Sequence, residues 1–145
     1  YAKNPVLRRS PYAGMLFNGA GRPINPDGVA LTLAASMGGN KTPIVDEAEI
    51  FNGESSYVAN YHQQLQTGAL PRTGTAPSRL RRITIDEALA IQSFPYDYKM
   101  AGSQSAMYKQ IGNAVPCRLA EVVARTVHEA LSIGLNKFVG QSMVA

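Results

Sequence analysis

The 145-residue chain is 45% hydrophobic and 17% charged, so it can bury a core and is not globally disordered. Its 14 basic and 10 acidic residues give a formal net charge of +4, which tolerates an anionic partner without requiring one. The single cysteine excludes an internal disulfide, no apolar run reaches the length of a membrane span, and residues 1–14 lack the apolar core of a signal peptide. We therefore expect a soluble, cytoplasmic chain that does not enter a membrane. Because it does not begin with Met, we also expect a fragment or a processed product.

Glycine and proline recur at short intervals through residues 1–70. Short apolar or mixed runs at 14–17, 29–35 and 42–46 are bounded by turn-forming residues, which is typical of short strands joined by tight turns. Gly, Pro, Thr and Ser then dominate the chain, and we place a basic linker at 71–82. Basic clusters can face phosphate, although most are merely solvated. The arginines of this cluster are Arg72, Arg79, Arg81 and Arg82, and an acidic stretch with Asp46, Glu47, Glu49 and Glu54 precedes them.

Helices are predicted after the linker. Thr84 followed by Glu87 is a capping box, and Pro95 closes the helix that it starts. A short helical turn is expected over 105–111. The longest helix should begin near Pro116, follow an apolar stripe, and stop at Gly134, leaving a tail at 134–145.

Cys117 is a candidate nucleophile because it sits at a predicted helix start beside Arg118, which favours thiolate. A cysteine nucleophile also needs a base. His128 lies about three helical turns further on, and His62 has no recognisable link to the cysteine. The alternative is a small residue near a helix start. The two histidines and one cysteine have no metal-ligand spacing, so no metal site is predicted.

Two motifs, in order, carry a family resemblance. RRITIDEALAIQSFP and YKQIGNAV resemble the last two blocks of DNA cytosine-5 methyltransferases. The first block is carried by Arg81, Thr84, Glu87, Gln92, Phe94 and Pro95, and the second runs over 108–115. Residues 10–24 and 30–47 are similar to the target-recognition region of bacterial members. The family's Pro-Cys loop, glycine-rich cofactor motif and Glu-Asn-Val block are not in the chain. The resemblance therefore implies the C-terminal part of the enzyme, with the nucleophile elsewhere and Cys117 not catalytic.

The resemblance also implies site residues. S-adenosyl-L-methionine is the family's cofactor, and Asn113 matches an asparagine that lines its pocket, with Ala114 beside it and Phe94 at an aromatic position near the methionine end. The alternative is that Asn113 only caps a helix. The expected contacts with double-stranded DNA are Thr32, Ser36, Gly38, Gly39, Asn40, Lys41 and Arg22. The alternative for the GGNKT sequence is a plain hairpin turn. Arg81 or Arg82 is expected to brace the recognition region against the last helices.

The fold class implied is α+β: a small strand-and-turn recognition region at 1–70, the linker at 71–82, and a helical segment at 83–133 that would complete a Rossmann-like methyltransferase domain. Two functions remain open. The first is a piece of a cytosine methyltransferase that is inactive alone and needs the N-terminal catalytic region as its partner, with self-association of the separated piece. The second is a stand-alone DNA-binding module without a catalytic role.

Overall fold

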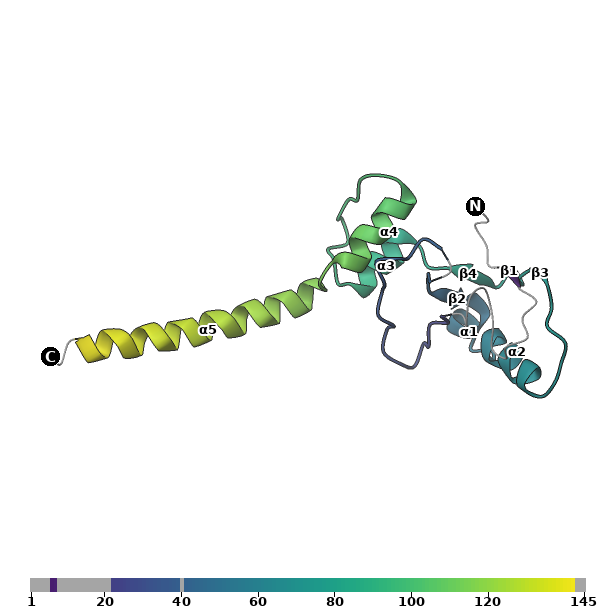
Figure 1. The fold of residues 1–145 in the computed structure, drawn as a ribbon, viewed down its shortest axis with the longest axis horizontal. Coiled ribbons are helices and arrows are strands. Elements are labelled where there is room, and N and C mark those ends of the chain that lie inside the picture. Colours follow the sequence, from purple (N-terminus) through teal and green to yellow (C-terminus); the bar gives the residue numbers. More distant parts are fainter. Residues whose placement is uncertain (1–5, 8–21, 40, 143–145) are drawn as a thin grey trace.

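In the computed structural model, a body of short strands and short helices carries one long helix that extends away from it (Figure 1). The structure describes residues 6–7, 22–39 and 41–142; the strand predicted at 14–17 and the side chain of Asn40 lie outside these residues. β1 (Val6–Leu7) pairs antiparallel with β3 (Gly74–Thr75), and β2 (Ile44–Asp46) pairs antiparallel with β4 (Leu80–Arg82). The α+β expectation is confirmed at the level of a mixed chain with small antiparallel sheets.

β2 separates two hydrophobic clusters. Successive side chains of a strand point to opposite faces. Ile44 accordingly packs in a cluster with Val58, Tyr61, Leu65, Ala76 and Leu80. Its neighbour Val45 packs in a second cluster with Leu33, Met37, Ile83, Ala88, Leu89, Tyr108 and Ile111. The body is therefore built on both faces of one three-residue strand.

The prediction of strands and turns throughout 1–70 is wrong in two places. Residues 29–35 form no strand, and Val29 is 91% exposed. The segment after β2 is helical, with α1 (Glu47–Asn52) capped by Asp46 and α2 (Tyr57–Gln66) capped by Ser56. Aspartate and serine are favoured N-caps because their side-chain oxygens accept from free backbone N–H groups of the first turn. Gly53 ends α1 in the left-handed region with φ of 67°.

The expected linker is part of the folded body. Its last three residues form β4, and Ala76 and Leu80 are buried. Burial of Leu80 against Ile44 requires β4 to pair with β2, which lies more than thirty residues earlier in the chain. A composition rich in Gly, Pro and Thr could not show this long-range pairing.

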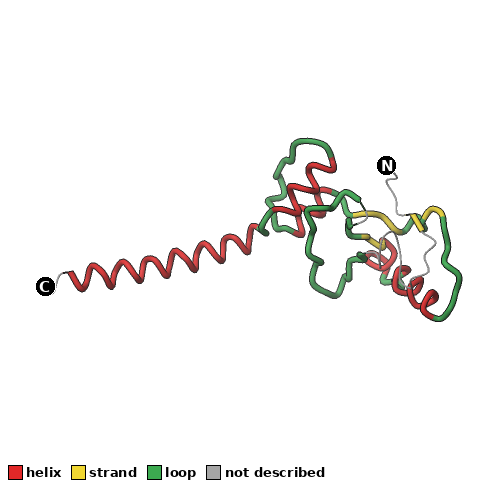
Figure 2. Tube along the Cα trace, in the orientation of Figure 1, coloured by secondary structure: helices red, strands yellow, loops and turns green. Residues whose placement is uncertain are grey.

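The helices after β4 are α3 (Ile85–Ile91), α4 (Gln104–Asn113) and α5 (Cys117–Ser142). The capping box of Thr84 and Glu87 is confirmed, and the helical turn predicted over 105–111 is confirmed as the centre of α4. The stop predicted at Gly134 is wrong, because α5 continues to Ser142 (Figure 2). One interior glycine costs a helix only about 1 kcal/mol, and no proline follows it. No helix of the described residues is long and apolar enough to cross a membrane.

Candidate functional site

The two motif blocks are joined by two hydrogen bonds between residues at either end of α3 and residues of α4. The buried Tyr108 hydroxyl donates to the carbonyl of Ile83, just ahead of α3. At the other end, buried Gln92 donates from Nε2 to the carbonyl of Ile111 at 3.3 Å. Burial raises the pKa of Tyr108, which keeps its hydroxyl protonated as a donor. The blocks therefore form one unit. Sequence reasoning assigned no role to Tyr108 or Gln92, although both lie inside the motifs.

The expected cofactor residues lie in two different places. Asn113 is the exposed last residue of α4, and half-buried Ala114 follows it as the C-cap, donating its N–H to Ile111 at 3.1 Å. Phe94 instead packs on Tyr98, with ring centroids 4.8 Å apart, and lines a hollow with Ile85, Leu89, Met100, Met107 and Arg118. Neither Asn113 nor Ala114 lines that hollow. The C-cap of α4 is Ala114 and not Asn113, and the Asn113 side chain makes no hydrogen bond within the described part of the chain.

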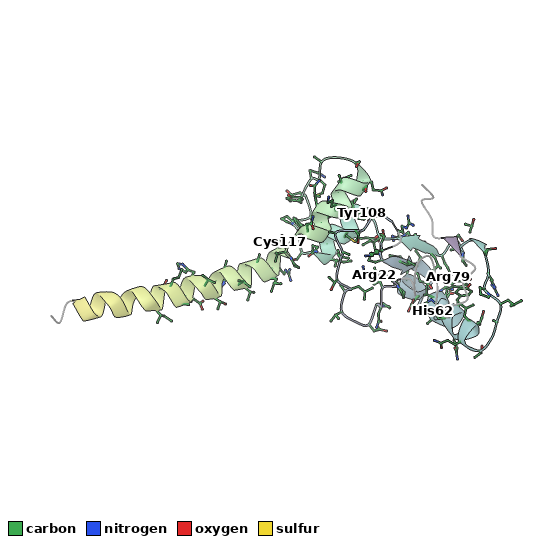
Figure 3. All side chains as sticks on the ribbon, in the orientation of Figure 1. Arg22, His62, Arg79, Tyr108 and Cys117 are labelled. Atoms are coloured by element: carbon green, nitrogen blue, oxygen red, sulfur yellow. The ribbon has the colours of Figure 1, made fainter. Side chains whose placement is uncertain are left out.

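Cys117 is held at the start of α5 by hydrogen bonds from α5 to the two residues that follow α3. Its N–H donates to the carbonyl of Gln92 at 3.0 Å, and the N–H of Arg118 donates to Ser93 Oγ at 3.0 Å. Ser93 adopts a left-handed φ of 56°. His62 lies in α2, well away from Cys117 (Figure 3). His128 is further along α5, about 16 Å away by helical rise. This geometry gives the half-buried thiol no histidine base.

Residues 32–41 are here called the 32–41 loop. Arg22 joins the two ends of this loop, here called its neck, by binding the carbonyls of its first and last residues. Its Nη1 donates to the carbonyl of Lys41 at 3.1 Å, and its Nη2 donates to the carbonyl of Thr32. Thr42 braces the turn from inside, since Oγ1 accepts from the N–H of Gly38 and donates to the carbonyl of Gly39, each at 2.9 Å. Two donors of Arg22 are thus used within the chain, a role that sequence reasoning missed.

The 32–41 loop has a buried side and an exposed side. Leu33 and Met37 are 5% and 4% exposed and belong to the same cluster as Tyr108 and Ile111 of α4. The side chains of Thr32, Ser36 and Lys41 are exposed, and Gly38 and Gly39 are half-buried. The plain-hairpin reading is wrong, because no strand precedes the turn within 22–39. The loop is instead anchored on the motif helix with its polar side chains outward.

Two arginines of the basic cluster, Arg79 and Arg81, form ion pairs with the acidic cluster. Arg81 donates from Nε to the Glu47 carboxylate at 2.6 Å. Its Nη1 and Nη2 atoms donate to the two carboxylate oxygens of Glu87 at 2.8 and 2.7 Å. The paired Glu87, and then Glu47, raise the pKa of Arg81, and Arg81 lowers that of Glu87. Because Glu47 belongs to α1 and Glu87 to α3, the bracing role expected at this arginine pair is confirmed for Arg81.

Comparison with known proteins agrees with the two motifs. The sequence model of the C-5 cytosine-specific DNA methylase family matches residues 20–129. The chain belongs to this family, whose members generally use S-adenosyl-L-methionine and act on DNA. It is 45% identical over 53 residues to the Type II methyltransferase M.AplI of Arthrospira platensis, a match covering 37% of this chain and 15% of the relative.

Two further relatives show how far the similarity extends. The Type II methyltransferase M.Bpa9945I of Bacillus paralicheniformis is 42% identical over 52 residues, covering 36% of this chain and 12% of the relative. The Type II methyltransferase M1.HphI of Haemophilus parahaemolyticus is 31% identical over 94 residues, covering 62% of this chain and 25% of the relative. The matches thus span a quarter or less of these relatives. No solved structure matches the chain.

Proposed function

We propose that this chain is the C-terminal part of a DNA (cytosine-5)-methyltransferase, supplying target-DNA recognition and one wall of the cofactor pocket. The observation that carries the proposal is the joining of the two motif blocks by Tyr108 and Gln92, which presents Asn113 at the exposed end of α4. A stand-alone DNA reader would have no use for such a unit. We place recognition in 1–70 and the helical part of the catalytic domain in 83–133, completed by a Rossmann-like partner region.

The residues at the end of α4 fit a cofactor wall. The Asn113 amide offers a donor and an acceptor, and neither is used within the described part of the chain. Asn113 and Ala114 would hold part of S-adenosyl-L-methionine, which supplies the methyl group when bound. Phe94 would contact the cofactor from its separate hollow. Cys117 takes no part in the chemistry, because its geometry provides no base, and the attacking thiolate comes from the partner region.

The partner region would cover α5. Residues 118–131 of this helix are exposed, and the apolar side chains Leu119, Val122, Val123, Val127 and Leu131 are each more than half exposed. Apolar faces of this kind mark surfaces that pack against another protein. The N-terminal catalytic region of the methyltransferase is the occupant that follows from the family.

The DNA-facing surface would be the exposed side of the 32–41 loop. Cytosine must leave the base stack before it is methylated, and contacts with the flanking DNA offset the cost of unstacking. Thr32, Ser36 and Lys41 offer polar groups, Gly38 and Gly39 allow close backbone approach, and we include Asn40 from the sequence alone. Arg22 would act mainly by holding the neck of the loop closed.

Two measurements test the proposal. Labelled S-adenosyl-L-methionine and duplex DNA should give no methyl transfer with the chain alone, and transfer should appear when a polypeptide with the upstream family motifs is added. In that mixture, Asn113→Ala should raise the KM for the cofactor. Asn52→Ala is the matched control, because Asn52 is also an exposed last residue of a helix. Transfer by the chain alone, or equal effects of the two variants, would overturn the proposal.

A further inference from the structure

Gly112 lies where α4 touches the 32–41 loop, and the contact leaves no room for a side chain. A Cβ atom at this position would lie 2.5 Å from the carbonyl carbon of Ala34 and 2.6 Å from the amide nitrogen of Ala35. It would come closer still to the carbonyl oxygen of Ala34. These neighbours are backbone atoms, which cannot rotate away as the tip of a side chain can. Glycine is therefore required at this position for close approach of two backbones.

The loop contacts α4 a second time, nearer the start of the helix, where Gly38 lies against Ser105 and Tyr108. A Cβ atom at Gly38 would lie 3.5 Å from Oγ of Ser105 and 3.6 Å from the ring of Tyr108, which is ordinary contact. Gly38 has φ of +100°, so a side chain there would strain the backbone even though space exists. The loop is thus seated along α4 from Ser105 to Gly112, about two helical turns.

Contacts on both sides of Ala34 restrict movement of the loop backbone at this residue. Arg22 binds the carbonyls at both sides of the loop neck, and Thr42 holds the turn between them. Leu33 and Met37 fix the flanks of Ala34 in the core. On the helix side, Asn113 directly follows Gly112 and is the residue that the proposed function assigns to the cofactor.

We propose that Gly112 is a positioning residue through which the 32–41 loop and the Asn113 end of α4 stabilise each other's conformation. Coupling of this kind is reciprocal, so order imposed at either end lowers the cost of ordering the other. Cofactor bound at Asn113 would then favour the DNA-binding form of the loop, and DNA on the loop would favour the cofactor-binding form of the helix end. This consequence rests on the proposed function, whereas the contact and its test do not.

Amide hydrogen exchange of the complete chain tests the coupling directly. In Gly112→Ala, exchange in the loop should become at least about tenfold faster, while α2, which packs in the other cluster, keeps its wild-type rates. Gly28→Ala is the matched control, because the three atoms nearest to a Cβ atom there all belong to the exposed side chain of Asn25 and none to the backbone. It should leave both the loop and α4 unchanged. Wild-type loop exchange in Gly112→Ala would overturn the proposal.

The reverse direction gives an independent test that does not depend on how Gly112→Ala folds. Thr42→Val removes the hydroxyl that braces Gly38 and Gly39. Exchange should accelerate in the loop and also at residues 112–115, and Thr42→Ser, which keeps the hydroxyl, should restore both. Acceleration confined to the loop would refute the coupling. Neither DNA nor cofactor is present, so failure of the methyltransferase proposal and failure of this one are separate results.

Discussion

Arg79 places its Nε atom 2.6 Å from Oδ1 of Asp46, a carboxylate that is 1% exposed. The same carboxylate accepts from the N–H of Tyr57 at 2.8 Å and from that of Glu49 at 3.4 Å. One buried side chain therefore caps α1, fixes the start of α2 and binds an arginine beside β4. Buried charges persist in proteins when hydrogen bonds of this kind compensate them.

Removing Arg79 should destabilise the chain strongly. Arg79→Ala leaves the Asp46 carboxylate buried without its cation, and we expect a loss of about 2 kcal/mol in the free energy of unfolding, discounted because the arginine is partly exposed. Arg125→Ala is the matched control, since Arg125 pairs with Glu121 on the exposed face of α5 and should cost less than about 0.5 kcal/mol. Urea unfolding measures both. Equal losses would contradict the role assigned to the Asp46 pair.

Stability should fall in acid through Glu87. Its bonds with Arg81 lower its folded-state pKa below the ordinary value of 4.5. A carboxyl whose pKa is lowered by folding contributes stability that is present above its unfolded pKa and is lost as pH falls through its folded pKa. Glu87→Gln should therefore lower the midpoint of urea unfolding at pH 7. Below about pH 4.5, the midpoint of this variant should fall less steeply with decreasing pH than that of the wild type. Glu129→Gln, on the exposed surface of α5, is the control and should show the wild-type dependence of the midpoint on pH. The wild-type dependence in Glu87→Gln would refute the role assigned to Glu87.

Replacement of the cysteine should spare catalysis. In the enzyme reconstituted with its N-terminal region, Cys117→Ala should keep methyl transfer within severalfold of wild type, because the thiol has no base beside it. Loss of a true nucleophile costs on the order of a millionfold in kcat. A drop of more than about a thousandfold in a folded variant would show that Cys117 attacks the substrate.

The separated chain should associate with itself through α5. Its exposed apolar stripe favours burial against a second copy when the catalytic region is absent. Val123→Glu should reduce the mass measured by light scattering toward that of a monomer. His128→Glu adds the same negative charge to an exposed residue about 140° round the helix from Val123, away from the stripe, and should leave the mass unchanged. A wild-type chain that stays monomeric at high concentration would rule out this association.

Duplex DNA should bind the isolated chain weakly and through its phosphates. Affinity at physiological salt should be micromolar or weaker and should fall steeply as salt rises. Lys41→Ala should weaken binding equally for all sequences and reduce the salt slope by about 1. Lys109→Ala, an exposed lysine on α4, is the control. Gel-shift titrations at several salt concentrations measure the effect, and tight binding that ignores salt would exclude a phosphate-based interface.

Local chemistry made parts of this structure predictable. The capping box at Thr84 involves residues three apart, so the sequence alone displays it. Long-range contacts left no such local sign. Nothing near Leu80 shows that it pairs with β2, and nothing near Gly112 shows that Ala34 rests on it. Asn113 was assigned from the family motif, and the structure adds that its side chain is exposed at the end of α4.

The placement of Ile44 and Val45 on opposite faces of β2 limits how family members could exchange the region that we propose for DNA recognition. A graft that replaced all of 1–70 would remove the wall shared by both clusters, and the motif helices would lose Leu33, Met37 and Val45 from their core. A viable transplant must therefore keep the β2–β4 pair of the host and change the exposed part of the 32–41 loop. Chimaeras between family members should fold according to whether their junctions respect that strand pair.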